Sequence, residues 1–312
     1  AGLNATQERG TIQLRVANAL WPQEGYPFLG AFLALTKAHY GVSITPIDYG
    51  DAKAARKMIN AWVEEKTKAK IKDLIGPGVL DALTRLVLVN AIYFKGNWTS
   101  QFDESLTEES PFWVTPIQQV EVPLMTQKRR FGYAETDDLQ VLEMSYSGED
   151  LSMLLFLPKG VDGLEGLENA LTMENVKRWT SRLWQREVRV SLPRFRITGY
   201  LRLDDVLISM GMVDAFDKDK ADFSGMDGRA PWLHIGAVLH KAFVEVNEEG
   251  TEAAAATAVV MLSRSVPPPP VVFSADHPII FVIREKRPGS IFLLGRIRNT
   301  ISRTPEKVTG LN

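Results

Sequence analysis

Apolar residues recur at helical spacing in two segments near the start of the chain. The first segment predicts one short helix within residues 26–40, which Gly41 ends. The second predicts a longer helix over residues 54–75, followed by a stop signal at residues 76–78. Alternating lysines near its end are interpreted as a solvated face, with anion binding as the alternative: Lys66, Lys68, Lys70 and Lys72.

The run LVLVNAIYF at residues 86–94 is rich in β-branched and aromatic residues. It is too apolar for an edge, so it predicts a central strand that is buried on both faces. Further strands are predicted over residues 151–157, 187–196, 279–284 and 291–297, the last two joined by a turn that contains Pro288 and Gly289. Because helices and strands do not alternate in βαβ order, the expected fold class is α+β.

Composition narrows the class of protein. Of the 312 residues, 45% are hydrophobic and 24% are charged, so a globular protein with a sizeable core is expected. The formal net charge of -2 argues against nucleic acid as the main partner. No uninterrupted apolar run approaches the roughly 18 residues that a membrane helix needs, so no membrane partner is expected.

Signals for catalytic, metal and cofactor chemistry are missing from the sequence. There is no Cys, and the four histidines have no close ligand spacing. There is no GxSxG elbow, no GxGxxG turn and no GxxxxGK(S/T) loop. We therefore expect neither a metal nor a cofactor, and the chain is predicted not to be an enzyme.

The segment at residues 248–270, EEGTEAAAATAVVMLSRSVPPPP, has no single local preference. Its four consecutive alanines favour a helix, Thr257, Val259 and Val260 favour a strand, and the four prolines favour a stiff extended end. As a strand starting at Thr251, it would carry small residues first and apolar residues later on one face.

This pattern suits insertion between existing strands, because small side chains at the start present little steric barrier. Gly250 supplies freedom for a hinge, and an extended chain from there to Arg264 spans about 45 Å. Arg264 is the single charged side chain across residues 253–275 and precedes Ser265, as a bait for a trypsin-like protease requires. The simpler interpretation is an alanine-rich linker, or an amphipathic helix with a proline-rich spacer.

Short motifs are distributed along nearly the whole chain. They are Ile59, Asn60, Trp62, Val63, Thr67, Lys70 and Ile71; Asn90, Ala91, Tyr93, Phe94, Lys95, Gly96 and Trp98; VPLMTQ (122–127), LSMLLFLP (151–158), SLPRF (191–195), GMVDAF (211–216), ADFSGM (221–226), HKAFVEV (240–246), EEGTEAAAAT (248–257), DHP (276–278) and Gly295. In this order the motifs resemble the serpin family. Ala69 stands where the family usually has Gly, and Ile279 where Phe is common.

The resemblance implies the α+β serpin fold, with a large central mixed β-sheet, additional β-sheets, surrounding helices and an exposed reactive-centre loop. It implies one serpin domain over residues 1–302, with the loop at about residues 248–270, and a C-terminal tail at residues 303–312. The family's N-terminal helices have no counterpart in this sequence. We therefore expect an N-terminally truncated domain whose strand at residues 86–94 is partly uncovered.

The resemblance also implies the site. Family members place the hinge glutamate at the seventeenth position back from the attacked bond, which from Glu248 gives Arg264–Ser265 as the reactive bond. The implied hinge comprises Glu248, Glu249, Gly250, Thr251, Glu252, Ala253, Ala254, Ala255, Ala256 and Thr257. The implied supports of the breach and shutter are Asn90, Lys95 and Trp98.

Two functions follow from the resemblance. The first is suicide inhibition of a trypsin-like serine protease, which forms a covalent acyl-enzyme at Arg264 before the released segment inserts into the central sheet. The alternative is a non-inhibitory serpin that acts as a carrier, chaperone or storage protein. The small residues at 253–256 favour the inhibitor.

Two further expectations concern partners and location. Six arginines around one predicted strand suggest either the solvated side of a hairpin or a glycosaminoglycan surface: Arg182, Arg186, Arg189, Arg194, Arg196 and Arg202. Glycosylation sequons at Asn4 and Asn97 lead us to expect an extracellular protein.

Overall fold

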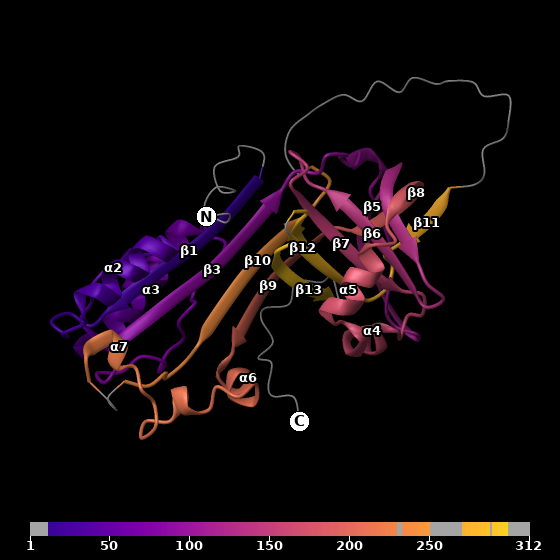
Figure 1. Ribbon diagram of the computed structural model, residues 1–312. Helices are drawn as coiled ribbons and strands as arrows, with labels where there is room; N and C mark the ends of the chain where they lie inside the picture. Colours follow the sequence, from indigo (N-terminus) through magenta and orange to yellow (C-terminus); the bar gives the residue numbers. More distant parts are fainter. Residues whose placement is uncertain (1–11, 230–232, 250–269, 288, 299–312) are drawn as a thin grey trace, which may run out of the picture. The chain divides into compact units, whose positions relative to one another are not determined.

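The computed structural model describes residues 12–229, 233–249, 270–287 and 289–298 (Figure 1). They form two compact units, one built mainly from residues 95–196 and 245–298 and the other from residues 14–94 and 197–244. Each unit combines a β-sheet with helices, which confirms the expected α+β class.

The sheet of the second unit has five strands in the order β2-β1-β3-β10-β9. The strands are β1 (Ile12–Pro22), β2 (Ser43–Ile44), β3 (Leu86–Gly96), β9 (Phe195–Arg202) and β10 (Leu239–Val246). β3 and β10 run parallel, with His240 opposite Asn90 and Val244 opposite Phe94. Parallel neighbours need long crossover connections, and residues 97–238 indeed separate β3 from β10.

An apolar core joins this sheet to one of its helices. The unit contains α2 (Gly30–Tyr40), η1 (Tyr49–Asp51), α3 (Ala52–Lys66), α6 (Asp204–Ser209), η3 (Asp214–Phe216) and α7 (Ser224–Asp227). Ile59 and Val63 of α3 are buried together with Ala91 and Tyr93 of β3. The helix predicted within residues 26–40 is confirmed by α2, whose C-cap Gly41 has a left-handed φ of 60°.

The helix predicted over residues 54–75 is wrong in its length. α3 ends at Lys66, and after the C-cap residue Thr67 come Lys68 and Ala69, which have φ values of 52° and 60°. A right-handed helix cannot include such residues. The chain therefore leaves the helix well before the stop signal at residues 76–78.

Polar side chains fix residues 67–75 in place of helical hydrogen bonds. Thr67 Oγ1 donates to the carbonyl of Val63 at 2.7 Å and accepts from the backbone N–H of Ile71 at 3.1 Å. The Asn60 side chain bonds both the N–H and the carbonyl of Ile75, each at 2.9 Å. Ile71 and Ile75 are at most 1% exposed, so the predicted apolar face is buried although the helix ends early.

The strand predicted at residues 86–94 is confirmed by β3, which is central in its sheet. The prediction that both of its faces are buried is wrong. Ala91 and Tyr93 are at most 3% exposed, whereas Leu88 on the opposite face is 66% exposed. On the face of Leu88 the burial is uneven, because Phe94 at the far end of β3 is only 1% exposed. The apolar run reflected a central position in the sheet, and the second face of β3 is covered only in part within the described residues.

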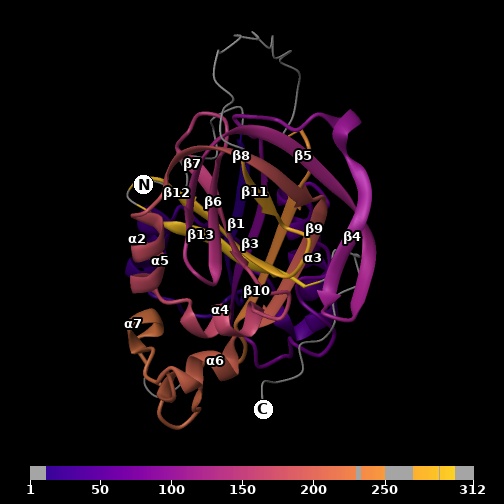
Figure 2. The same cartoon turned by 90° about the vertical axis from the view of Figure 1, so that its right-hand side faces the viewer.

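The sheet of the first unit has eight strands. They follow the order β11-β8-β5-β6-β7-β12-β13, and β4 pairs with β5 outside this path (Figure 2). The strands are β4 (Glu108–Thr115), β5 (Gln118–Glu135), β6 (Leu139–Ser145), β7 (Leu151–Pro158), β8 (Trp184–Pro193), β11 (Val271–Ser274), β12 (Ile279–Glu285) and β13 (Ile291–Ile297). The unit also contains η2 (Glu104–Leu106), α4 (Leu164–Ala170) and α5 (Met173–Thr180).

Three of the predicted strands in this unit are confirmed, namely β7, β12 and β13. β12 and β13 form an antiparallel hairpin, and Gly289 in the turn has a φ of 98°. Gly295 lies opposite Phe281 across the hairpin. A Cβ at position 295 would approach the Phe281 ring to 2.4 Å, so the ring occupies the space that a side chain would need.

The strand predicted at residues 187–196 is two strands. β8 ends at Pro193 in the eight-stranded sheet, and β9 begins at Phe195 in the five-stranded sheet. Arg194 stands between them, and its backbone N–H donates to the carbonyl of Pro123 at 2.9 Å. The apolar pattern continues through this change of sheet and does not reveal it.

The left-handed backbone at Ala69 predicts that Ala69→Gly stabilises the protein. Glycine adopts a φ of 60° without the steric penalty of a Cβ, so we expect the free energy of unfolding to rise by about 0.5–1 kcal/mol. The matched control is Ala61→Gly in the exposed interior of α3, which should lower it by about 1 kcal/mol. Urea denaturation measures both, and a loss of stability in both variants would contradict the strain at Ala69.

Candidate functional site

The candidate site lies where the chain leaves β10. After Val246, the last residue of β10, come Asn247, Glu248 and Glu249, and the chain is described again from residue 270, just before β11. The other proposed hinge residues, Gly250, Thr251, Glu252, Ala253, Ala254, Ala255, Ala256 and Thr257, and the proposed reactive bond Arg264–Ser265 lie outside the described residues. The described part of the site therefore consists of the residues on either side of this segment, up to Glu249 and from residue 270.

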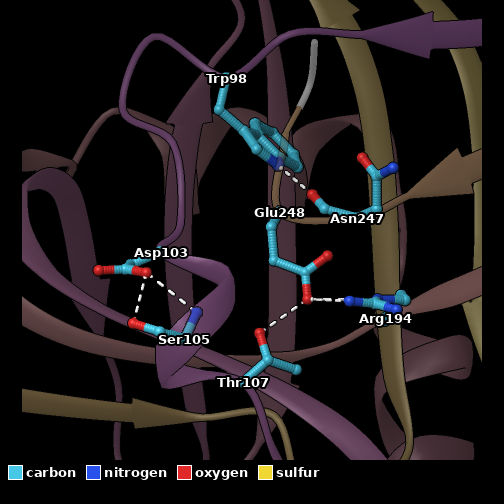
Figure 3. A network of polar contacts seen from close by, with 7 residues as sticks. All are labelled: Trp98, Asp103, Ser105, Thr107, Arg194, Asn247 and Glu248. Atoms are coloured by element: carbon cyan, nitrogen blue, oxygen red, sulfur yellow. Dashed lines mark hydrogen bonds and ion pairs between the residues drawn. The ribbon is translucent and has the colours of Figure 1, made fainter. Parts of the chain in front are cut away.

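Glu248 is buried at the first of these ends, with 1% of the residue exposed. Its Oε1 atom accepts hydrogen bonds from Arg194 Nη2 at 2.5 Å, from Arg194 Nε at 3.2 Å and from Thr107 Oγ1 at 2.7 Å (Figure 3). Its backbone carbonyl accepts from the N–H of Phe102 at 3.2 Å. Both the side chain and the main chain of Glu248 are thus held.

The pKa of the Glu248 carboxyl reflects this setting. Burial by itself would raise the pKa, but the hydrogen bonds from Arg194 and Thr107 outweigh burial and hold it below its ordinary value of 4.5. Glu248 is therefore an ionised, buried carboxylate at neutral pH. Glu249 beside it is exposed.

An aromatic pair supports the same stretch of chain. Trp98 Nε1 donates to the carbonyl of Asn247 at 3.1 Å, and the Trp98 ring stacks on Tyr146 with a centroid distance of 4.5 Å. Asp103 accepts from the N–H and the hydroxyl of Ser105 at 2.9 and 2.7 Å, which orders η2 just before Thr107 (Figure 3). The polar contacts around Glu248 are thus built on locally fixed turns.

Asn90, a second proposed support, belongs to a different cluster. Its Nδ2 donates to Asn18 Oδ1 at 2.8 Å, and its Oδ1 lies 3.0 Å from His240 Nδ1. These contacts join side chains of β1, β3 and β10. Burial lowers the pKa of His240 below 6.5, so this histidine is neutral at neutral pH.

Lys95, the third proposed support, is half-buried near the end of β3. Within the described part of the chain, the side chains bonded to the Glu248 carboxylate are those of Arg194 and Thr107. The structure thus brings Trp98 and Glu248 into one network and places Asn90 in another.

The far end of the segment is held by β11 and by a histidine. β11 runs parallel to β8, with Phe273 opposite Val190. Beyond it, His277 Nδ1 lies 2.7 Å from Asp276 Oδ1, and His277 Nε2 lies 2.7 Å from the carbonyl oxygen of Pro158.

The ionisation of His277 follows from this geometry. Both ring nitrogens face oxygen acceptors, and an imidazole satisfies two acceptors only when both nitrogens carry hydrogen. Burial would lower the pKa of His277, but the bonds to Asp276 and Pro158 outweigh it and raise the pKa above 6.5. The pKa of Asp276 is lowered, because its bonds to His277 and Ser274 outweigh the effect of burial.

Sequence reasoning missed Arg194 and Thr107 as partners of the hinge. Arg194 was grouped with arginines on the solvated side of a hairpin, yet its exposed side chain binds a buried carboxylate, and Arg196 and Arg202 do the same. Their partners are Glu248, Glu245 and Asp204 respectively. The SLPRF motif at residues 191–195 was the available signal, but a pairing across 54 positions leaves no local pattern.

The described residues contain no group of three or more His, Asp or Glu side chains that could hold a metal ion. None of the described helices is long and apolar enough to cross a membrane.

The chain matches a known protein family and several proteins of that family. Residues 2–300 match the family model described as "Serpin (serine protease inhibitor)". Human leukocyte elastase inhibitor is 44% identical over 292 residues, which cover 91% of this chain and 76% of that protein. Human Serpin B3 is 45% identical over 289 residues, 91% of this chain and 74% of that protein.

Two solved structures are also similar. Uncleaved ovalbumin has a TM-score of 0.85 and 32% identity over 95% of this chain and 77% of that chain. Serpin48 of the insect Tenebrio molitor has a TM-score of 0.81 and 33% identity over 95% of this chain and 79% of that chain. The serpin fold expected from the motifs is therefore confirmed.

One expectation is overturned by these comparisons. Sequons at Asn4 and Asn97 led to the expectation of an extracellular protein. Leukocyte elastase inhibitor and Serpins B3 and B4 are intracellular clade B serpins, so that expectation is wrong. A three-residue sequon arises by chance too often to indicate a compartment.

The ion pair at Glu248 predicts that Arg194→Met destabilises the protein. At neutral pH the variant leaves a buried carboxylate without its cation, and we expect a loss of about 2 kcal/mol in the free energy of unfolding. The loss is smaller than for a fully buried pair because 46% of the Arg194 side chain is exposed.

Two further variants isolate this effect. Arg194→Met with Glu248→Gln should recover most of the loss, because no buried charge remains. The exposed Arg182→Met is the matched control and should change stability by less than about 0.5 kcal/mol. Equal urea midpoints for Arg194→Met and Arg182→Met would rule out the proposed role of the pair.

The half-buried His240 and the buried His277 predict opposite pH dependences. The folded pKa of His277 is raised, so its contribution to stability is complete below pH 6.5 and is lost as the pH rises through the folded value. The folded pKa of His240 is lowered, so the unfolded state binds its proton more tightly and stability falls as the pH drops below 6.5. His277→Gln should remove the alkaline slope and His240→Gln the acidic one, in urea midpoints measured from pH 5 to 9. A wild-type midpoint that is flat above pH 6.5 would show that His277 is not held as imidazolium.

Proposed function

The chain belongs to the serpin family, and we propose that it inhibits a trypsin-like serine protease that attacks the bond between Arg264 and Ser265. The observation that carries the proposal is the buried anchor at Glu248. It fixes the start of a segment whose sequence has small residues first and one isolated arginine later.

The covalent step is acyl transfer. The serine oxygen of the protease bonds to the carbonyl carbon of Arg264 and gives its proton to the histidine of the protease; the bond to the Ser265 nitrogen breaks, and that nitrogen takes up the proton from the histidine. Residues up to 264 are then tethered to the protease as an ester at one end and to β10 at the other. This segment can now move without its former continuation into β11.

The anchor determines where such movement starts. Glu248 is bonded through its side chain and its carbonyl, and Asn247 is bonded to Trp98. Glu249 is exposed, and Gly250 follows it in the sequence, so these are the first positions proposed to turn the chain back alongside β10. A strand that turns back there runs antiparallel to β10 and begins with Thr251 and the alanines.

Arg264 supports the trypsin-like class. Human leukocyte elastase inhibitor, to which the chain is similar, is named for a different protease. Specificity at the attacked bond depends on the side chain that precedes it, and an arginine fits a pocket with an acidic residue at its base. The proposal for this chain therefore rests on its own Arg264.

The proposal predicts an SDS-resistant adduct between trypsin and the protein, with cleavage after Arg264. Arg264→Leu should abolish the adduct with trypsin. It should allow an adduct with chymotrypsin, because the specificity pocket of chymotrypsin is apolar and accepts leucine. The matched control is Arg287→Leu in the exposed turn before β13, which should leave the trypsin adduct unchanged.

Gel electrophoresis and mass spectrometry of the released peptide distinguish the outcomes. Cleavage after Arg264 without an adduct would favour the non-inhibitory alternative, a carrier, chaperone or storage protein. Cleavage at another arginine without an adduct would remove Arg264 as the reactive residue.

A further inference from the structure

Ser105 lies in η2 and carries an exposed hydroxyl within an acidic stretch of chain. Acidic residues stand one and two positions before it and three and four positions after it, and all of them are exposed: Asp103, Glu104, Glu108 and Glu109. A protein kinase with a basic substrate groove selects its serine by such a charge pattern. The stretch DESLTEE at residues 103–109 therefore has the chemistry of a substrate for an acid-directed kinase.

Exposure distinguishes Ser105 from other hydroxyls with similar flanks. Five hydroxyl residues in the sequence have an acidic residue three positions later: Thr45, Ser100, Ser105, Ser147 and Ser224. Ser105 is exposed, whereas the other four are half-buried. The backbone hydrogen bonds that close η2 run to the carbonyls of Asp103 and Glu104, at 3.0 and 3.1 Å. A single 3₁₀ turn of this kind opens locally with little loss of packing, so its hydroxyl can enter an active site.

The Ser105 side chain belongs to the contacts that lead to Glu248 (Figure 3). Asp103 accepts from the N–H and the hydroxyl of Ser105 at 2.9 and 2.7 Å. Two residues later, Thr107 Oγ1 donates to Glu248 Oε1 at 2.7 Å. Two residues span at most about 7 Å of chain, so a group added to Ser105 stays close to this carboxylate.

A phosphate on Ser105 would oppose these contacts. It carries about 1.5 to 2 negative charges at pH 7 and takes away the hydroxyl proton that Asp103 accepts. Repulsion between the phosphate and Asp103 disfavours the closed turn that holds Thr107. The same charge disfavours the buried, ionised carboxylate of Glu248.

Arg194 already responds to the charges of this stretch. Its pKa is raised, first by the hydrogen bond to Glu248 and further by the charges of Glu104 and Glu109. Both glutamates flank Ser105 and act on the guanidinium that neutralises Glu248. A phosphate on the same stretch would compete with Glu248 for this guanidinium, because arginine binds phosphate strongly.

We propose that Ser105 is a phosphorylation site for an acid-directed protein kinase, and that phosphate there loosens the anchor at Glu248 and lowers the yield of inhibited protease. Ser105 Oγ bonds to the γ-phosphorus of ATP, the bond from that phosphorus to the β–γ bridging oxygen breaks, and ADP leaves. The hydroxyl proton passes to the catalytic carboxylate of the kinase. The modification and the loosening are independent of the proposed function, whereas the lower yield rests on it.

The first experiment tests the modification. Casein kinase 2, an acid-directed kinase, should transfer about one phosphate per molecule from ATP in the presence of Mg²⁺, and mass spectrometry should locate it at Ser105. Ser105→Ala should abolish the incorporation. Ser224→Ala, the matched control with an acidic residue at the same spacing, should leave it unchanged. No incorporation, or incorporation at another residue, would overturn the proposal.

Hydrogen exchange tests the effect on the anchor. The N–H of Phe102 donates to the carbonyl of Glu248, so its exchange reports whether the anchor is closed. Phosphorylation should speed the exchange at Phe102 about tenfold or more, while the buried Val190 inside β8 should exchange as before. An unchanged rate at Phe102 would show that the phosphate does not loosen the anchor.

Urea denaturation tests the electrostatic coupling to Glu248. Phosphorylation should lower the urea midpoint of the wild type. It should lower the midpoint of Glu248→Gln by less than half as much, because the repulsion needs the carboxylate. Equal shifts in the two proteins would overturn the coupling and confine the effect to η2.

Inhibition of trypsin separates this inference from the proposed function. Phosphorylation should raise the stoichiometry of inhibition about twofold or more, because a loosened anchor delays insertion. If the unphosphorylated protein forms no adduct, the proposed function fails, yet phosphate at Ser105 and faster exchange at Phe102 would still support the modification and the loosening. An adduct with the same stoichiometry before and after phosphorylation would overturn the effect on inhibition.

Discussion

The carboxylate of Glu248, where the chain leaves β10, has almost no access to water. Its charge has to be neutralised by neighbouring side chains, and this requirement constrains the elements that carry them. An unpaired charge buried like that of Glu248 would cost several kcal/mol. Arg194 supplies the opposite charge from the point where the chain passes from β8 to β9, and Thr107 adds a hydroxyl from the turn before β4. Segments far apart in the sequence therefore meet at one carboxylate. The segment that follows Glu248 therefore starts from a residue that Arg194 and Thr107 hold in place.

The same charges indicate which edge of β10 can open. β10 lies between β9 and β3. On the β9 side, Arg196 pairs with the buried Glu245. If β9 and β10 separated, the buried carboxylate of Glu245 would lose its cation. On the β3 side, the side-chain contacts are between neutral groups, namely the hydrogen bond between Asn90 and His240 and the ring contact between Tyr93 and Phe243. Neutral hydrogen bonds that water can replace cost about 1 kcal/mol each. The proposed inserted strand would therefore enter between β3 and β10.

Periodicity and motifs predicted different parts of this molecule. β3, β7, β12 and β13 were found because apolar runs of strand length leave a local pattern, whereas the predicted hinge and the predicted reactive residue Arg264 rest on the serpin motifs. The end of α3 was misplaced because Thr67 and Asn60 replace helical bonds by side-chain bonds while the apolar spacing continues. Arg194 was assigned to a solvated face because an arginine that binds a distant carboxylate has the same local sequence as one that binds water. An ion pair such as Arg194–Glu248 depends on how distant segments are aligned with one another in the fold. The sequence of one segment does not specify this alignment.

The sheet itself provides a reason why insertion would proceed once the chain is cut. β3 and β10 now share one parallel ladder, with five residue pairs from His240 and Asn90 to Val244 and Phe94. A strand entering between them would run antiparallel to both, so one parallel ladder would be exchanged for two antiparallel ladders. Antiparallel pairing is slightly more stable per residue than parallel pairing, and the number of ladders rises by one. β11, which follows the segment in the sequence, pairs with β8, so the proposal is that the uncut connection to β11 hinders this exchange. On this proposal the continuous chain would store the driving force, and cleavage at Arg264 would release it.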